Sequence, residues 1–519
     1  MFTLGSLAIS ASRKLVESTL LILLLLSVAL AGGGRYLMQR QLWMDEVHSW
    51  LLITEPATER SLQALADGVD YNPPTYLILA RQLRYLPGGI TESSLRLLSL
   101  ILMLLVIVGI FVLLRRRFPV LVCIAAVLMM ASSIHLIYQS TEIRFYPLWC
   151  AACAWLCVVL DVQATKQRWL LRFNNFVAVL LAAVMPSTHY FGILTLGLIC
   201  TGAMLVPDPA RDRRRIIVLT AITGVVCLLG CLPFLIGQRA ALTRNTWVSP
   251  ATVDDSIGFL TAMFPLAPTI VCGVAFVVSL ALNKSRHRTA GPQSPATVDV
   301  TPDNTESIGN QVMFLAPCLL LALMPLVIVL LSWTVQPALV ARYAVTGGLG
   351  FGAIFAILMS RCGPGLQKLL VVAGGVLFLR SVLICSEEWR GIDHVRDNLV
   401  KELMSLPADG PIVFEDRTTS MPVLHSHPDL HARCSLIDFE EDQLSGDSSL
   451  RIVQRDVGRR ILQWYPEYTM RSIDSLDETS TFYIVPYVEP QSASLVWPIS
   501  HALTKVSPRI DRYDRRENP

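Results

Sequence analysis

LRLLSLILMLLVIVGIFVLLRRR, residues 95–117, decides the fold class of this chain. Its first twenty residues contain one charged side chain, that of Arg96, and three arginines follow them. About twenty apolar residues make a helix long enough to cross the hydrocarbon core of a bilayer. Arginines that end such a run are typical of the cytoplasmic side of a membrane. The segment therefore predicts a transmembrane helix whose carboxyl end faces the cytoplasm.

Apolar runs of this kind recur along the chain. Of its 519 residues, 53% are hydrophobic and only 16% are charged. A soluble globular chain has about 25% charged residues, so the deficit indicates a polytopic α-helical membrane protein. The net charge of +3 is too small to indicate a nucleic-acid partner. We expect about eleven transmembrane helices, at 18–38, 95–114, 118–138, 145–163, 171–187, 190–207, 215–237, 257–282, 312–333, 342–360 and 368–386.

Lysines and arginines of the short loops predict the orientation of these spans. With the amino terminus in the cytoplasm, seventeen of them lie in cytoplasmic segments. The short outer loops then hold four, namely Arg144, Arg239, Arg244 and Arg342. This excess of basic residues on the cytoplasmic side holds when successive spans cross the membrane in alternate directions. We therefore expect the amino terminus inside and the carboxy-terminal tail outside.

Three segments fall outside the spans. Residues 39–94 form the first outer loop, where PPTYLILARQLRYL predicts a helix lying at the membrane interface. Residues 284–310 are rich in Pro, Ser and Thr without an apolar period, so we expect a disordered cytoplasmic linker. The tail, 387–519, alternates helix-like and strand-like stretches and is long enough to bury a core. We expect a transmembrane domain over 1–386 and a small α/β domain on the outer face over 387–519.

The first outer loop opens with two neighbouring acids. Asp45 and Glu46 stand in WMDEVHSW, residues 43–50, between tryptophans, which favour the headgroup level of a membrane. A carboxylate at that level can take a proton from an acceptor hydroxyl or hold a divalent cation. Solvated acids in an interfacial loop are the rival interpretation.

Later outer loops contain further candidates. Glu142 and Arg144 follow one span, as an exposed ion pair or as part of a site. His189 stands at a helical hairpin, where a lone histidine is more often structural. Arg342 begins a span, and its fork of donors either reaches the membrane surface or binds a phosphate group. All of these side chains share the outer side, which random scatter would not easily produce.

Five short segments of the outer loops follow one another along the chain: WMDE (43–46), NPPTYL (72–77), EIRFY (142–146), THY (188–190) and RY (342–343). In this order, they resemble the C-type (GT-C) membrane glycosyltransferases. This group includes protein O-mannosyltransferases, the aminoarabinose transferase of lipid A and related bacterial transferases. Asn72 stands where family members often have histidine, and glycines follow the last segment where a proline is common, so the subfamily and the acceptor stay open.

The resemblance implies a reaction and a place for it. The donor would be a hexose or pentose linked to a polyprenyl phosphate in the bilayer, and the acceptor a glycan, a lipid or a protein. Transfer would be an inverting single displacement. It would take place at the periplasmic face of a bacterial cytoplasmic membrane.

The resemblance also implies roles for individual side chains. Asp45 would act as general base or as part of an acidic site that orients the acceptor. Glu142 would complete that site, through a divalent metal ion if one is bound by the two acids. Arg144 and Arg342 would stabilise the charge of the departing phosphate. The remaining expected site residues are Glu46, as a secondary acid, and His48, Tyr146 and His189, as substrate-binding groups.

Two other classes of function remain open at this stage. A transporter or lipid flippase usually places ionisable residues near the middle of the membrane, whereas these spans have nearly uncharged midsections. A non-catalytic scaffold for glycan assembly would not require acids and arginines gathered on one side. No pattern in the sequence specifies the sugar, the acceptor or the oligomeric state.

Overall fold

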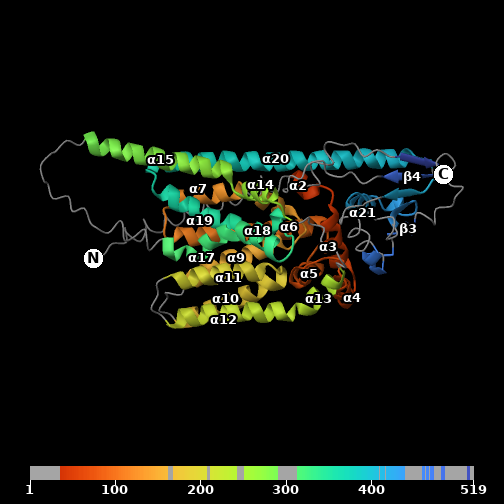
Figure 1. The fold of residues 1–519 in the computed structure, drawn as a ribbon, viewed down its shortest axis with the longest axis horizontal. Helices are drawn as coiled ribbons and strands as arrows, with labels where there is room; N and C mark the ends of the chain where they lie inside the picture. Colours follow the sequence, from red (N-terminus) through yellow and green to blue (C-terminus); the bar gives the residue numbers. More distant parts are fainter. Residues whose placement is uncertain are drawn as a thin grey trace.

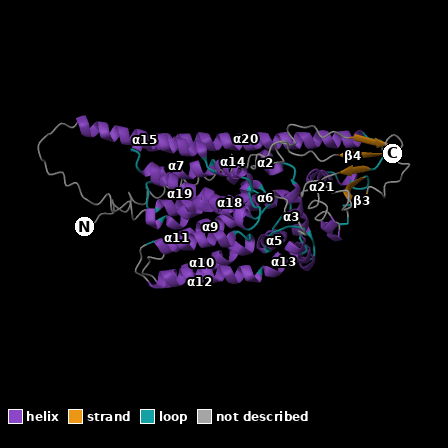
Figure 2. Cartoon of the chain, viewed as in Figure 1, coloured by secondary structure: helices purple, strands orange, loops and turns teal. Residues whose placement is uncertain are grey.

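The computed structural model describes twelve parts of the chain, which form a long helical bundle with a small sheet at one end (Figure 1). Within these parts, strands occur only in the tail (Figure 2). The predicted first span, 18–38, lies outside them except for its last residues, which belong to α2 (Arg35–Gln39). The described residues are 35–161, 168–206, 211–241, 251–289, 312–407, 410–414, 417–438, 459–461, 463–466, 468–472, 481–485 and 511–514.

Each predicted span from 95–114 onward coincides with helix. Some spans are a single helix and others are two or three consecutive pieces. The helices are α6 (Glu92–Arg115), α7 (Val120–Ala131), α8 (Ile134–Thr141), α9 (Tyr146–Asp161), α10 (Arg168–Thr188), α11 (Gly192–Leu205), α12 (Arg211–Gly230), α13 (Leu232–Ala241), α14 (Val253–Met263), α15 (Leu266–Thr289), α17 (Ala316–Leu319), η3 (Leu320–Leu323), α18 (Met324–Thr334), η4 (Ala341–Ala344), α19 (Gly347–Ser360) and α20 (Pro364–Ser405).

Three stretches of helix in the described residues are long and apolar enough to cross a bilayer unaided: α6, Ala316–Thr334 and α20. Three bent pairs meet the same requirement if each pair counts as one span. The bends are 76° between α7 and α8, 46° between α12 and α13, and 63° between α14 and α15. The described residues thus contain three to six candidate spans, and the count of eleven stays a prediction.

Helix α20 links the bundle to the tail without a break. Its 42 residues correspond to a length of roughly 63 Å, about twice the thickness of a hydrocarbon core. The expected domain boundary at residue 386 therefore falls inside a helix. In a similar way α15 continues to Thr289, into the segment expected to be linker, and 290–310 lie outside the described residues.

The first outer loop folds into short helices that are tied to one another: α3 (Met44–Thr54), α4 (Thr58–Ala66), α5 (Thr75–Arg81) and η1 (Gln82–Tyr85). Helix α5 begins directly after Pro73-Pro74, where a fixed backbone angle favours the first turn. Arg81 at its end donates to the carbonyls of Leu52 and Ile53 at 2.9 and 3.2 Å. Carbonyls in the last turn of a helix lack partners within the helix, so this arginine fixes α5 against the end of α3.

The tail contains a five-stranded sheet with the order β3-β2-β1-β4-β5. Helix α21 (Arg417–Ser426) connects the parallel strands β1 and β2, which forms a βαβ unit, and it lies between the sheet and α3 (Figure 1). All three residues of β1 are buried, as expected for a central parallel strand. The strands are β1 (Ile412–Phe414), β2 (Cys434–Asp438), β3 (Met470–Ser472), β4 (Thr481–Val485) and β5 (Asp511–Asp514), of which only β5 runs antiparallel to its neighbour.

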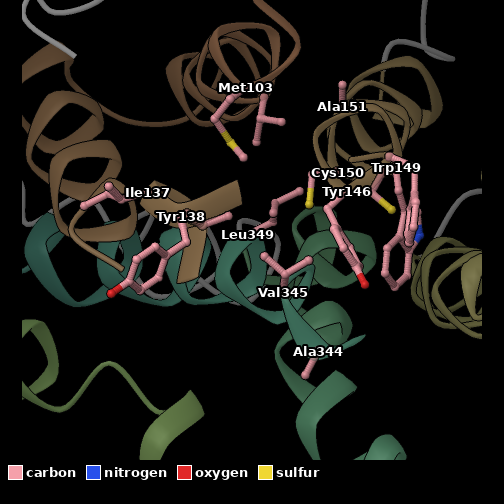
Figure 3. Close-up of a cluster of buried hydrophobic side chains, with 14 of the residues drawn as sticks. Met103, Ile137, Tyr138, Tyr146, Trp149, Cys150, Ala151, Ala344, Val345 and Leu349 are labelled. Atoms are coloured by element: carbon pink, nitrogen blue, oxygen red, sulfur yellow. The ribbon is translucent and has the colours of Figure 1, made fainter. Parts of the chain in front are cut away.

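A buried hydrophobic cluster fixes the two segments that precede α9 and α19 (Figure 3). Tyr146 and Trp149 of α9 lie opposite Ala344, Val345 and Leu349 in this cluster, and all five are buried. Close packing of this kind allows little movement of the side chains that it contains. Because Tyr146 and Ala344 stand two residues after Arg144 and Arg342, the cluster restricts the backbone on which both arginines are carried.

Helix α19 packs so closely on the stretch α17–η3 that one of its glycines has no room for a side chain. A Cβ atom at Gly350 would meet the backbone nitrogen of Ala322, and backbone cannot give way as the end of a flexible side chain can. Gly375 of α20, in contrast, has nothing within 4 Å of the same position.

We expect Gly350→Ala to lower the free energy of unfolding by about 1–3 kcal/mol, because the added methyl group forces the two helices apart. Thermal unfolding of the full chain in detergent measures the effect. Gly375→Ala is the matched control and should melt at or above the temperature of the unchanged chain. Equal melting temperatures for Gly350→Ala and the unchanged chain would contradict the packing described.

Candidate functional site

The expected site residues come together at the end of the bundle that faces the sheet (Figure 1). They are carried by α3, by the segment 142–144 that follows the bent pair α7–α8, by the first residue of α9, by the turn between α10 and α11, and by η4. The bend between α7 and α8 brings the 142–144 segment against α3, where Arg144 donates to the carbonyl of Asp45 at 3.1 Å. Residues nearly 300 positions apart in the sequence therefore share one buried site.

Asp45 is held between two arginines. Its Oδ2 lies 2.8 Å from Nη1 of Arg342 and 3.9 Å from Nη2 of Arg144. Burial raises the pKa of Asp45, but the charges of Arg342 and Arg144 outweigh burial and hold this pKa below its ordinary value. The carboxylate is therefore an anion at neutral pH. Its side chain keeps 12% of its surface exposed, so the site is not sealed.

Arg144 has a second carboxylate partner that the sequence analysis missed. Its Nη1 lies 2.7 Å from Oδ2 of Asp70 and donates to the hydroxyl of Ser49 at 3.0 Å. Asp70 also accepts a hydrogen bond from the side-chain amide of Asn72 at 2.8 Å. The one signal in the sequence is that Asp70 stands two residues before the Asn-Pro-Pro segment. The resemblance covered that segment but not the acid in front of it.

Glu46 lies deeper than Asp45 and its carboxylate is surrounded by donors. Arg40 approaches it with both Nη atoms at 2.6 and 2.9 Å, and Arg96 lies at 3.4 Å. The backbone N–H groups of Trp43 and Ile143 donate to the same carboxylate at 3.2 and 2.9 Å. Glu46 has no exposed surface. This geometry favours a structural role for Glu46, in place of the catalytic role that the resemblance implies.

Glu142 is completely buried and is electrically different from Asp45. Among the described residues its carboxyl oxygens have no hydrogen-bond partner, although its backbone carbonyl accepts from Ser99 at 2.5 Å. Burial and the charge of Glu46 raise the pKa of Glu142 to about 8, against the opposing effect of nearby arginines. Glu142 is therefore mostly protonated at neutral pH, beside an ionised Asp45.

A divalent cation shared by Asp45 and Glu142 does not fit this arrangement. The described residues contain no group of three or more His, Cys, Asp or Glu side chains placed to hold a metal ion. A cation at Asp45 would also lie beside the guanidinium groups of Arg342 and Arg144, which repel it. Asp45 is instead paired with arginines.

His189 is packed between aromatic rings. Its ring is stacked on those of Phe145 and Trp149, with centroid separations of 5.0 and 4.7 Å, and its Nδ1 accepts from the backbone N–H of Phe191 at 3.1 Å. Burial and the charges of Arg144 and Arg342 lower the pKa of His189 to about 3. His189 is thus a neutral side chain that fixes the turn between α10 and α11.

His48 and Tyr146 are both buried beside the charged groups of the site. Nε2 of His48 lies 3.2 Å from the sulfur of Met421 in α21. Burial and the charge of Arg417 lower the pKa of His48 to about 3, although Asp45 opposes them. The hydroxyphenyl ring of Tyr146 is buried in the hydrophobic cluster against Phe145, at a centroid distance of 4.1 Å (Figure 3). Their expected roles as substrate-binding groups stay predictions.

An apolar crevice lies directly behind the segment that carries Arg342. Ala344, Val345 and Gly348 form one wall. Met263 and Pro265, at the bend between α14 and α15, line it as well. A buried cationic group therefore stands at one side of η4, and a narrow apolar space stands at the other.

Basic residues gather at the opposite end of α6. Arg96, near the start of this helix, is part of the ion-pair network around Glu46. Arg116 and Arg117, just beyond its end, pair with Asp161. The 24 residues of α6 correspond to about 36 Å, so the acidic site and the basic cluster are separated by more than the thickness of a hydrocarbon core.

Comparisons with known proteins found likenesses among solved structures only. No family model matches the sequence, and no curated protein matches it. ArnT from Cupriavidus metallidurans in the apo state shares 13% identity with a TM-score of 0.43, covering 90% of this chain and 93% of that one. ArnT from the same organism bound to undecaprenyl phosphate shares 12% identity with a TM-score of 0.37, over the same shares of the two chains. Both TM-scores lie below 0.5, so these likenesses carry no statement about the family or function of this chain, and the resemblance to the GT-C transferases stays a prediction from the motifs.

We expect Glu46→Gln to destabilise the protein by about 3–5 kcal/mol, because the substitution leaves the charges of Arg40 and Arg96 buried without their carboxylate. Thermal unfolding of the purified chain measures this loss. Glu59→Gln, on the exposed side of α4, removes the same charge from a side chain in solvent and serves as the control. A Glu46→Gln protein as stable as this control would contradict the structural role.

The raised pKa of Glu142 predicts how stability depends on pH. This pKa is higher in the folded than in the unfolded chain, so binding of a proton by Glu142 stabilises the folded chain. This stabilisation is complete below the ordinary pKa of glutamate and is lost as pH rises to about 8. Melting temperatures of the unchanged chain and of Glu142→Gln, whose amide does not titrate, are compared from pH 4 to 9. The advantage of Glu142→Gln should grow between pH 4.5 and 8 and then level off. Parallel curves would show that Glu142 titrates normally.

Proposed function

We propose that this chain is a glycosyltransferase that moves a sugar from a polyprenyl-phosphate-linked donor to a glycan, lipid or protein acceptor. The observation that carries the proposal is the buried pairing of Asp45 with Arg342 and Arg144. A carboxylate matches a reacting hydroxyl, and two guanidinium groups match a phosphate.

The reaction follows from these groups. The acceptor oxygen attacks the anomeric carbon of the sugar on the face opposite the phosphate. A new carbon–oxygen bond forms as the bond from that carbon to the phosphate oxygen breaks, which inverts the configuration. The acceptor proton passes to Asp45, and the polyprenyl phosphate leaves with the electron pair of the broken bond. Arg342 and Arg144 stabilise the charge that develops on this phosphate.

Donor binding also prepares the base. In the structure Arg342 is the closest cation to the carboxylate of Asp45, and its charge lowers the pKa of that group. A phosphate that takes Arg342 as its partner weakens this effect and raises the pKa of Asp45. The carboxylate then becomes a stronger proton acceptor when the donor is in place. Glu142, protonated at neutral pH, adds no negative charge that would repel the phosphate.

We place the reaction at the periplasmic face of a bacterial cytoplasmic membrane. The basic cluster at residues 115–117 lies at the end of α6 remote from the site, and such clusters favour the cytoplasmic side. The site and the tail then face outward. A transporter would more often hold its charged groups halfway along the bundle, whereas here they gather at one end.

The chemical test is made in cells and needs no purified protein. Lipid extracts and surface glycans are compared by mass spectrometry between cells with the intact gene and cells without it. We expect a polyprenyl-phosphate sugar to accumulate in its absence and one glycan modification to disappear. Movement of a lipid-linked sugar across the membrane without any covalent transfer would favour a flippase instead.

We expect Asp45→Asn to lower the rate of sugar transfer by about 10²–10⁴-fold, because an amide cannot take the acceptor proton. The protein should insert and fold, with a lower melting temperature because Arg342 loses its carboxylate partner. Transfer is measured with the purified chain in lipid nanodiscs and the accumulated donor. Asp254→Asn, on the exposed first turn of α14, is the matched control and should keep full activity. Full transfer by Asp45→Asn would overturn the site assignment.

A further inference from the structure

The carboxy-terminal domain reaches the site through α21. Met421 of this helix contacts His48 of α3, with 3.2 Å between the sulfur and Nε2. One turn later, His425 lies edge-on to Trp50 with ring centroids 5.7 Å apart, and its Nε2 is 3.1 Å from Oε1 of Glu92. These contacts hold one face of α21 along α3.

The register of the two helices places Arg417 beside Asp45. Arg417, Met421 and His425 follow one another at intervals of four residues, so they share one face of α21. Asp45 and His48 share one face of α3 because they are three residues apart. Met421 meets His48 and His425 meets Trp50, so the two helices run in the same direction. One turn back along both helices, Arg417 is level with Asp45.

Burial and charge agree with this register. Only 7% of Arg417 is exposed, although it stands at the first position of a helix in the tail. After burial, Arg417 has the largest effect on His48, and its charge also acts on Asp45 together with the charges of Arg342 and Arg144. Three guanidinium groups therefore act on one carboxylate.

We propose that Arg417 binds the phosphate of the lipid-linked donor, as a third cation that the carboxy-terminal domain supplies to the site. This inference rests on the proposed function and identifies a binding residue outside the membrane helices. The chemistry matches because the phosphodiester of the donor presents two non-bridging oxygens that share its negative charge, and a guanidinium offers a fork of donors to both of them. Arg144 also pairs with Asp70, so it shares its donors between that carboxylate and the phosphate, and Arg342 and Arg417 complete the set of cations.

A consequence is that the site is complete only when the domain is docked. Helix α21 connects β1 and β2, so Arg417 is fixed to the sheet rather than to the bundle. The contacts of Met421 and His425 with α3 and α6 determine where the sheet stands. The carboxy-terminal domain then supplies a phosphate-binding residue to the site as well as covering it.

Binding of undecaprenyl phosphate to the full chain in nanodiscs tests the proposal, with undecaprenol as the uncharged comparison. We expect Arg417→Gln to weaken binding of undecaprenyl phosphate about tenfold or more and to leave binding of undecaprenol unchanged. Arg417→Lys, which keeps the charge but not the fork, should recover part of the loss. Lys401→Gln removes an exposed cation from α20 and is the control, with unchanged affinity for both lipids. Unchanged affinity for undecaprenyl phosphate in a folded Arg417→Gln protein would overturn the proposal.

A second measurement needs no substitution. Hydrogen exchange of residues 417–426 in the unchanged chain should slow when undecaprenyl phosphate is added and should not change with undecaprenol. Exchange that is the same with and without undecaprenyl phosphate would overturn the role of Arg417, even if its variants fold poorly.

These results separate the two proposals. A chain that binds undecaprenyl phosphate through Arg417 but transfers no sugar refutes the transferase and supports the role of Arg417. A chain that transfers sugar, and whose Arg417→Gln variant keeps full affinity for undecaprenyl phosphate, supports the transferase and refutes the role of Arg417.

Discussion

The buried carboxylate of Glu46 is the constraint on which the geometry of the site depends. An ion pair inside a protein is tolerated only when every charge has partners, and Glu46 meets this condition with two arginines and two backbone N–H groups. One of those N–H groups belongs to Ile143, the neighbour of Arg144. The position of Arg144, and through it those of Asp45 and Asp70, therefore follows from a bond made one residue away.

Neighbouring residues of like chemistry have different roles here because the helix turns them apart. Successive residues of an α-helix point about 100° from each other, so Glu46 faces the bundle while Asp45 faces the site. Asp45 and Glu142 differ in protonation because their surroundings differ. Asp45 has arginine partners and stays ionised, whereas Glu142 has burial and a nearby negative charge and holds a proton at neutral pH. Two carboxyl groups with separated pKa values are a common basis for acid and base chemistry in one site.

The sequence predicts the helices better than their breaks, and the segments of the site better than its atoms. Apolar runs from residue 95 onward coincide with helices because a run of that length has few other folds. The bends between α7 and α8 and between α14 and α15 fall at Ser132-Ser133 and at Pro265, and these breaks are too short to lower the mean hydropathy of the apolar runs that contain them. The fall in hydropathy after residue 386 does not end α20, because polar residues without a proline continue a helix as readily as apolar ones.

The two partners that the sequence analysis missed have a common cause. Asp70 and Arg417 stand 25 and 372 residues from Asp45, and only the folding of the outer loop and the docking of the tail bring them near it. The motifs marked Glu46 as an acid beside Asp45, but a motif does not say which carboxylate has its lone pairs filled.

A site of this kind has to hold charges inside a membrane protein before any substrate arrives. The structure meets this requirement by pairing Asp45 with Arg342 and Asp70 with Arg144, and by keeping a proton on Glu142. An arriving phosphate takes the place of Asp45 as the partner of Arg342. Because Arg342, Arg144 and Arg417 outnumber Asp45 and Asp70 by one, the negative charge that the phosphate adds is compensated after this exchange. The same exchange frees the Asp45 carboxylate. In the proposed reaction, phosphate recognition and activation of the base are therefore a single electrostatic event, and this coupling requires that Asp45 and the arginines be partners in the resting protein.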